Sequence, residues 1–124
     1  MDFNKKLESY RREINGSLEE IFTKQEPAIL YEPMRYAVNI GGKRVRPILC
    51  GIFYRMLKGK KKKVLYPALA IELLHNFTLV HDDIMDDDDL RRNQQTVHVK
   101  WDLSTGVLSG DGIVSLAYRV LIKE

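Results

Sequence analysis

Apolar residues recur at spacings of three and four along most of the chain, which is the pattern of amphipathic helices. The first such stretch predicts a helix over about residues 2–24, which Pro27 ends. The apolar positions of this helix are Phe3, Leu7, Tyr10, Ile14, Leu18 and Ile21. Pro33 predicts the start of a second, shorter helix, and the pair Gly41-Gly42 predicts its end.

Three further helices are predicted downstream. Pro47 fits the first turn of a third helix, which is apolar around most of its circumference and is therefore expected to lie centrally. A fourth helix is predicted over about residues 64–85 and a fifth from about Ser104, whereas residues 87–103 are polar and lack periodicity. Because no βαβ pattern occurs, the predicted fold class is all-α.

The fifth predicted helix contains three glycines, Gly106, Gly110 and Gly112. Glycine lowers helix propensity, so we expect close contact with a neighbouring helix or backbone that approaches a ligand. The chain reaches Glu124 without a helix stop signal. We therefore expect the fifth helix to continue to the last residue, as in a truncated piece of a larger domain.

The composition narrows the class of protein. With 124 residues and 44% hydrophobic content, the chain can form one compact domain. The net charge is +3, but the lysines and arginines form no long patch. The densest basic run, residues 58–63, is predicted to be a solvated loop. We therefore do not expect nucleic acid as a partner. The single cysteine, Cys50, is expected to be a buried side chain in a reducing compartment. With no signal peptide and no stretch of ~20 apolar residues, we expect a cytoplasmic protein without a membrane span.

Clustered carboxylates end the fourth predicted helix. They are Asp82, Asp83, Asp86, Asp87, Asp88 and Asp89, and two arginines follow, Arg91 and Arg92. The carboxylates repel one another, and acids at a helix C-terminus oppose the helix dipole, so folding alone does not account for them. Asp82 and Asp86 are predicted to lie on one helix face, and His75 is predicted to lie on the same face two turns before Asp82. Carboxylate oxygens suit Mg²⁺, and neighbouring arginines suit phosphate.

Two other metal sites could use the same residues. An EF-hand loop beginning at Asp82 would have Asp87 where glycine is required and Asn93 where glutamate is required, so this match fails. The dyad His81-Asp82 also resembles that of metal phosphohydrolases, but such a site would use few of the other aspartates and neither arginine.

A second group of candidate residues lies between the second and third predicted helices. Gly41 and Gly42 allow backbone to approach a ligand, and the cations Lys43, Arg44 and Arg46 precede a helix N-terminus that offers free N–H groups. The segment is not a P-loop, because the spacing and the Ser or Thr of that motif are missing. Taken alone, it is equally compatible with a solvated basic helix start.

Together, the two groups closely resemble the trans-prenyl diphosphate synthases, or polyprenyl synthetases. The matching segments are 41–47, 72–75, 81–86, 90–92, 96–98 and 109–111, and their spacing also matches. The resemblance covers about residues 30–120. It implies a helical isoprenoid-synthase-type bundle, incomplete in this chain, of which residues 1–124 form the N-terminal portion of a single domain. As a full-length protein, a member of the family is expected to be a homodimer.

The resemblance also implies a reaction. Members join an allylic diphosphate to isopentenyl diphosphate head-to-tail, in a Mg²⁺-dependent reaction that begins with loss of the allylic diphosphate. By motif position, Asp82 and Asp86 correspond to Mg²⁺ ligands, with Asp83 in support, and Arg91 to a contact with the allylic diphosphate. The residues that correspond to the isopentenyl diphosphate pocket are Lys43, Arg46, His75 and Arg92.

Product length is expected to depend on Phe77 and Thr78, which lie just before Asp82. A bulky residue at this place resembles the floor that limits chain growth in the family, and it implies farnesyl- to geranylgeranyl-length products. An ideal helix turns Phe77 about 140° away from Asp82, so an ordinary core aromatic is the alternative.

The chain also departs from the family. Residues 93–95 replace the usual Gly-Lys-Pro, and the second aspartate-rich motif is missing, so residues 1–124 alone are expected to be inactive. One alternative function is a non-catalytic subunit of a heteromeric synthase, against which the intact first motif argues. The other is a class I terpene cyclase, against which Lys43, Arg46 and His75 argue, because a cyclase needs no second diphosphate.

Overall fold

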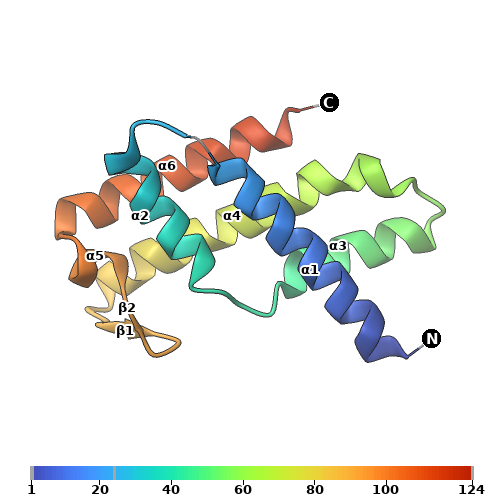
Figure 1. The fold of residues 1–124 in the computed structure, drawn as a ribbon, viewed down its shortest axis with the longest axis horizontal. Coiled ribbons are helices and arrows are strands. Elements are labelled where there is room, and N and C mark those ends of the chain that lie inside the picture. The colour runs from blue at the N-terminus through green and yellow to red at the C-terminus, as the bar shows by residue number, and fades with distance from the viewer. Residues whose placement is uncertain (1, 24, 124) are drawn as a thin grey trace.

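The computed structural model describes residues 2–23 and 25–123, apart from the side chains of residues 61 and 62. The described chain is mostly helical, which confirms the all-α prediction (Figure 1). The elements are α1 (Phe3–Phe22), α2 (Ala28–Asn39), α3 (Val45–Met56), α4 (Lys61–Met85), β1 (Leu90–Arg91), β2 (Gln94–Gln95), α5 (Val97–Lys100) and α6 (Leu103–Leu121). No helix among the described residues is long and apolar enough to cross a membrane.

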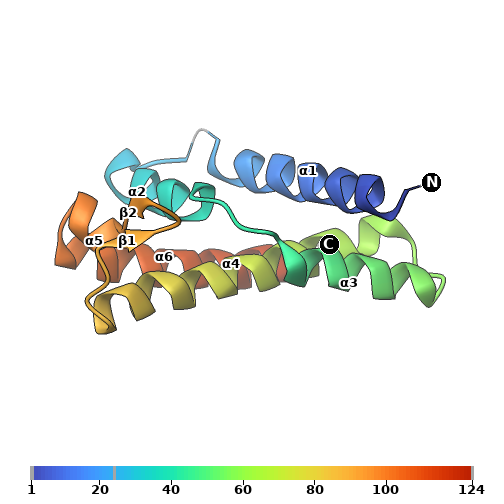
Figure 2. The same ribbon diagram turned by 90° about the horizontal axis from the view of Figure 1, so that it is seen from below.

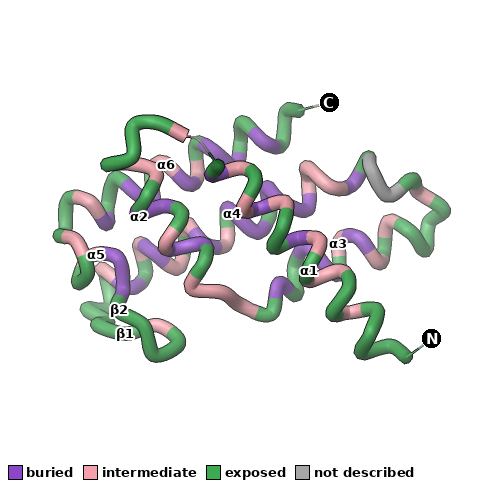
Figure 3. The backbone as a smooth tube through the Cα atoms, viewed as in Figure 1, coloured by how far each residue is buried: buried purple, intermediate pink, exposed green. Residues whose placement is uncertain are grey.

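The helices form two layers. Figure 2 shows α1 and α2 above a layer that contains α3, α4 and α6, in which α4 and α6 lie side by side and run in opposite directions. The core lies between the layers, where buried residues of the facing helices meet (Figure 3). Its fully buried apolar side chains include Leu18, Met34, Leu69, Leu73 and Ile113, contributed by α1, α2, α4 and α6.

Several predicted helix boundaries are wrong. The second helix begins at Ala28, so Pro33 lies inside it rather than at its start. Burial of Met34 and Val38 against the core compensates for the backbone hydrogen bond that a proline inside a helix cannot donate. The fourth helix begins at Lys61 and takes in part of the basic run that was expected to be a loop.

The fifth predicted helix corresponds to α6, and it does not extend to the last residue. It ends at Leu121, where the N–H of Ile122 donates to the carbonyls of Tyr118 and Val120. Glu124, like Lys24 in the first predicted helix, lies outside the described residues. Cys50 is half-buried rather than buried, and its partial burial raises the pKa of the thiol.

Residues 87–103 are ordered instead of irregular. Strands β1 and β2 pair antiparallel, with Leu90 opposite Gln95 and Arg91 opposite Gln94. The two turn residues, Arg92 and Asn93, have φ of 50° and 63°, which is the conformation of a type I′ hairpin. Two-residue strands have no detectable periodicity, which is why the hydrophobic pattern missed this hairpin.

The glycines of α6 allow neighbouring side chains to approach its backbone, as predicted. A Cβ at Gly110 would lie 2.2 Å from Nε2 of His81, and one at Gly112 would lie 2.7 Å from Sδ of Met34. The imidazole of His81 occupies this space and its Nε2 lies 3.1 Å from the carbonyl oxygen of Val107. The contact therefore joins the acidic end of α4 to α6.

We predict that Gly110→Ala lowers the free energy of unfolding by about 1–3 kcal/mol, because the new methyl group must displace the His81 imidazole from its bond to Val107. The matched control is Gly16→Ala in α1, where a Cβ would meet nothing within 4 Å. This control should raise stability by about 0.5–1 kcal/mol, since alanine is the better helix former. Chemical unfolding followed by circular dichroism measures both, and equal effects would contradict the packing argument.

Candidate active site

The last turn of α4 carries the aspartates into a tight reversal of the chain. The N–H of Asp86 donates to the carbonyl of Asp82 at 2.8 Å and caps the helix, and Asp87 then adopts a left-handed conformation with φ of 54°. The N–H of Asp88 donates to the carbonyl of Asp83 at 2.9 Å. The hydroxyl of Thr96 donates to the carbonyl of Asp88 at 2.8 Å, which ties the reversal to the start of α5.

The carboxylates of this turn have different environments. Asp82 and Asp86 are exposed, whereas Asp83 is buried. Nε of Arg91 donates to Oδ2 of Asp83 at 2.9 Å and Nη2 donates to Oδ1 at 2.7 Å. The hydrogen bond to Asp83 raises the pKa of Arg91 further above its already high ordinary value. Arg91 is therefore held in a bidentate ion pair, the strongest geometry available to a guanidinium and a carboxylate.

A divalent cation is suited to the exposed carboxylates. Asp82 and Asp86 offer hard oxygen ligands one helical turn apart and accessible to solvent, which fits the coordination chemistry of Mg²⁺. Within residues 2–23 and 25–123, no three His, Cys, Asp or Glu side chains are placed to hold one metal ion together. A Mg²⁺ ion held by Asp82 and Asp86 would therefore need further ligands, which Mg²⁺ commonly takes from water and substrate phosphate.

The structure brings the four residues of the second predicted pocket together. Lys43, Arg46, His75 and Arg92 line a cavity of about 220 Å³ between the Gly41-Gly42 loop, the start of α3 and the middle of α4. Nη1 of Arg92 donates to the carbonyl of Gly41 at 2.7 Å. A Cβ at Gly42 would lie 3.2 Å from Nη2 of Arg92, so the loop approaches the hairpin closely.

The expectation that Arg44 supplies a cation to a ligand is wrong. Arg44 also lines the cavity, but its side chain is buried and its charge is paired with Glu72. The residue itself adopts φ of 56° at the start of α3. Nη1 donates to Oε1 of Glu72 at 2.8 Å, Nη2 to the carbonyl of Val38 at 2.7 Å, and Nε to Oδ1 of Asn15 at 2.8 Å. Glu72 in an apolar helix stretch was the sequence signal for this pair, because a buried carboxylate requires a cation.

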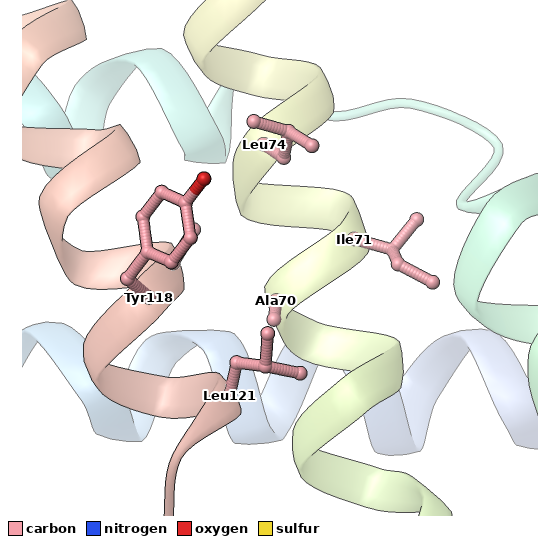
Figure 4. A pocket seen from close by; sticks show the side chains of 6 residues that line it. Ala70, Ile71, Leu74, Tyr118 and Leu121 are labelled. Atoms are coloured by element: carbon pink, nitrogen blue, oxygen red, sulfur yellow. The ribbon is translucent and has the colours of Figure 1, made fainter.

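An apolar groove lies between α4 and α6 (Figure 4). It has a volume of about 200 Å³ and is lined by Ala70, Ile71, Leu74, Ala117, Tyr118 and Leu121. On α4, Ile71 and Leu74 precede Asp82 by eleven and eight residues, so they lie on the same helix face as Thr78 and Asp82. The exposed carboxylates therefore stand at one end of an exposed face whose other end is apolar.

Phe77 does not lie on this face, because an ideal helix turns it about 140° away from Asp82. It is half-buried against the core, and its ring meets the imidazole of His81 edge-on at a centroid distance of 4.8 Å. Thr78 is exposed and its hydroxyl donates to the carbonyl of His75 at 2.6 Å. Sequence reasoning did not find the position of His81, whose Nε2 also lies 3.7 Å from Oδ1 of Asp111.

Comparison with known proteins gives the family. The sequence profile described as "Polyprenyl synthetase" matches residues 27–124. The chain belongs to the polyprenyl synthetase family. This match includes both groups of polar residues and all of the elements from α2 to α6.

Curated relatives among the polyprenyl synthetases are named as prenyl diphosphate synthases. The chain is 42% identical over 108 residues to the geranylgeranyl pyrophosphate synthase of Geoglobus acetivorans, a match that covers 87% of the chain and 34% of the relative. It is 42% identical to the farnesyl diphosphate synthase of Haemophilus influenzae, over 98% of the chain and 42% of the relative. The chain thus spans between one third and one half of these relatives. A Capsicum annuum relative is named as chloroplastic, and the cytoplasmic location of this chain stays a prediction.

Solved structures of polyprenyl synthetases have the same fold. The apo crystal structure of the farnesyl/geranylfarnesyl diphosphate synthase of Zymomonas mobilis matches with a TM-score of 0.90 and 37% identity, over 98% of this chain and 45% of that chain. The geranylgeranyl pyrophosphate synthetase of G. acetivorans matches with a TM-score of 0.88 and 38% identity, over 92% and 37% of the two chains. The fold is therefore that of part of an isoprenoid synthase, as predicted.

The ordinary pKa of a histidine side chain is near 6.5, and we predict that the pKa of His75 lies below this value. Burial lowers it first, the Arg46 charge lowers it further, and Glu72 partly opposes this shift. Because the folded state then binds the proton more weakly than the unfolded state, this group contributes stability above about pH 6.5 that is lost as the pH falls through the folded pKa. An NMR titration should show the pKa rising in Arg46→Ala, and a fall in this variant would contradict the assigned cause.

Proposed function

We propose that the chain supplies the Mg²⁺-binding carboxylates, the isopentenyl diphosphate pocket and part of the hydrocarbon wall of a prenyl diphosphate synthase. The observation that carries the proposal is the arrangement along α4. The exposed carboxylates lie at one end of a face of α4, and the apolar groove lies farther along the same face. The cavity lined by Lys43, Arg46 and His75 lies beside this helix. This combination suits two diphosphates and one hydrocarbon chain.

The cationic cavity has the chemistry of a diphosphate site. Lys43 and Arg46 are exposed and supply full positive charges. His75 lines the same cavity, and an anion bound there would favour the protonated form of its imidazole. Arg44 and Glu72 also line the cavity, but they are paired with each other and add no net charge, so the charges of Lys43 and Arg46 remain uncompensated. We therefore assign isopentenyl diphosphate to this cavity.

The allylic substrate is assigned to the acidic end of α4. Asp82 and Asp86 would hold Mg²⁺, which when bound neutralises charge on a departing diphosphate. Arg91 lies beside them and offers its unpaired N–H groups to the same diphosphate. Ile71 and Leu74 would line the path of the hydrocarbon and keep water away from the reacting carbon.

The test of this function requires a protein of the relatives' length. Residues 1–124 are joined to the part of the H. influenzae farnesyl diphosphate synthase that the chain does not match, and prenyl transfer to isopentenyl diphosphate is measured with Mg²⁺. The chimera should make a prenyl diphosphate, whereas residues 1–124 alone should make none. Product from residues 1–124 alone, or an active chimera that keeps its kcat in Asp82→Ala, would refute the proposal.

We predict that Lys43→Ala in this chimera raises the KM for isopentenyl diphosphate by about ten- to a hundredfold, because it removes a charge-assisted contact of ~1.5–3 kcal/mol. The KM for the allylic substrate should change little. The matched control is Lys6→Ala, which removes the same charge from the exposed surface of α1. Equal effects of Lys43→Ala on both substrates would mean that the cavity is wrongly assigned.

Product length is proposed to be in the farnesyl to geranylgeranyl range, limited by Phe77. In the chimera, Phe77→Ala removes the ring that packs edge-on against His81 near the acidic end of α4, so chromatography should show longer products. The matched control is Phe53→Ala on α3, which removes the same atoms from an exposed position of that helix. If both variants give the product lengths of the parent chimera, Phe77 is only a core side chain.

A further inference from the structure

The basic run at residues 58–63 has no part in the proposed function. It contains five lysines, and no acidic residue lies between Glu32 and Glu72 in the sequence. The structure places the run in the turn from α3 to α4 and in the first turn of α4. Figures 1 and 2 show this turn at one end of the molecule, far from the acidic end of α4. The run therefore lies at an extremity, where a large partner can reach it.

The lysines stand where folding alone does not favour them. Lys60 is the N-cap of α4, its described side chain makes no capping hydrogen bond, and the first turn of the helix contains no acidic residue. A helix N-terminus carries a partial positive charge, so cations there are unfavourable, and neighbouring lysines also repel one another. Glu13 of α1 lines a groove with Val64, but one carboxylate does not neutralise five lysines. An anionic partner would relieve this repulsion.

Two exposed apolar side chains stand beside the lysines. Met56 ends α3 and is 69% exposed, and Leu57 follows it and is 83% exposed. Lys58, Lys60 and Lys63 are also exposed, and none of them takes part in an ion pair among the described residues. Residues 56–63, the basic tip, thus combine aliphatic side chains and cations on one projecting turn.

This combination fits an anionic lipid surface better than a nucleic acid. Lysines attract negatively charged headgroups, while aliphatic side chains beside them enter the boundary between the headgroups and the acyl chains. A nucleic acid would pair with the lysines but would leave Met56 and Leu57 in water. The basic tip also contains no aromatic side chain on which a base could stack.

We propose that the basic tip docks the protein on the surface of a membrane that contains anionic lipids. This inference does not depend on the proposed function. Helix α4 runs from Lys61 to Met85, which is about 36 Å at ~1.5 Å per residue, so the basic tip and the exposed Asp82 and Asp86 lie at opposite ends of one helix. An anionic surface attracts one end and repels the other, so the acidic end faces away from the membrane.

The first experiment measures binding of the 124-residue protein to lipid vesicles by flotation. Vesicles of phosphatidylcholine and phosphatidylserine in equal parts should bind the protein, and vesicles of phosphatidylcholine alone should bind it at least about tenfold more weakly. The bound fraction should fall at high salt, because salt screens the lysines. Equal binding to both kinds of vesicle would mean that apolar surface alone binds lipid, and the proposal would be wrong.

A pair of double variants tests the lysines. Lys58→Gln combined with Lys60→Gln should weaken binding to the anionic vesicles about 25-fold, since each lysine near such a surface contributes about fivefold. The matched control is Lys100→Gln combined with Lys123→Gln, which removes the same charge from exposed residues outside the basic tip. Equal losses in the two double variants would show that net charge attracts the protein without regard to the basic tip, which contradicts the proposal.

Tryptophan substitutions test whether the apolar side chains enter the bilayer. Brominated lipid in the anionic vesicles should quench the fluorescence of Leu57→Trp more than that of Ile29→Trp, whose position at the start of α2 is 84% exposed. Both variants keep Trp101, so the difference reports the new side chain. Leu57→Ser should weaken vesicle binding at least about tenfold, whereas Ile29→Ser should not. Equal quenching of the two tryptophan variants would overturn the proposal.

Two other occupants of the basic tip are outcomes of further measurements. A double-stranded RNA oligonucleotide that binds the protein more tightly than the anionic vesicles do would identify nucleic acid as the partner and refute membrane docking. The chimera with the H. influenzae enzyme should bind the anionic vesicles and lose this binding in Leu57→Ser. A chimera that does not bind would show that the rest of the fold covers the basic tip, and the proposal would fail. Circular dichroism verifies that each variant is folded.

Discussion

The buried ion pair between Arg44 and Glu72 is the constraint on which the rest of the site depends. The two side chains are 3% and 4% exposed, so neither charge can be left without the other. Through Asn15, Val38 and Glu72, the guanidinium contacts α1, the end of α2 and α4, while its own residue starts α3. Removing one partner of such a pair typically costs about 3–5 kcal/mol, so the four helices are fixed relative to one another where the cationic cavity lies. Asn76 extends the network by donating to the carbonyl of Glu72 at 2.8 Å.

The aspartate cluster shows how the fold accommodates carboxylates that repel one another. Asp83 is compensated inside the protein by Arg91, and Asp82 and Asp86 remain in water, where their repulsion is screened. The unfavourable position of acids at a helix C-terminus is thereby limited to side chains that solvent can reach. One helical turn thus contains two kinds of aspartate, and neighbours in sequence have different environments.

The sequence predicted the features that depend on periodicity and on residue type. Helical spacing was sufficient for the five long helices, whereas it was the resemblance to the family that grouped Lys43, Arg46, His75 and Arg92, which line the cavity. The sequence did not predict features that depend on tertiary contacts. The start of α2 before Pro33 depends on packing, the hairpin depends on two residues with positive φ, and the inward direction of Arg44 depends on a partner 28 residues away.

The hairpin also has a mechanical consequence. Arg91 and Arg92 are consecutive, so their Cα atoms are ~3.8 Å apart. One side chain is fastened to the acidic end of α4 and the other to the Gly41 loop. A single peptide unit therefore acts as a spacer between the two diphosphate positions proposed here. A displacement of one position is transmitted to the other through a link that bond geometry does not allow to stretch.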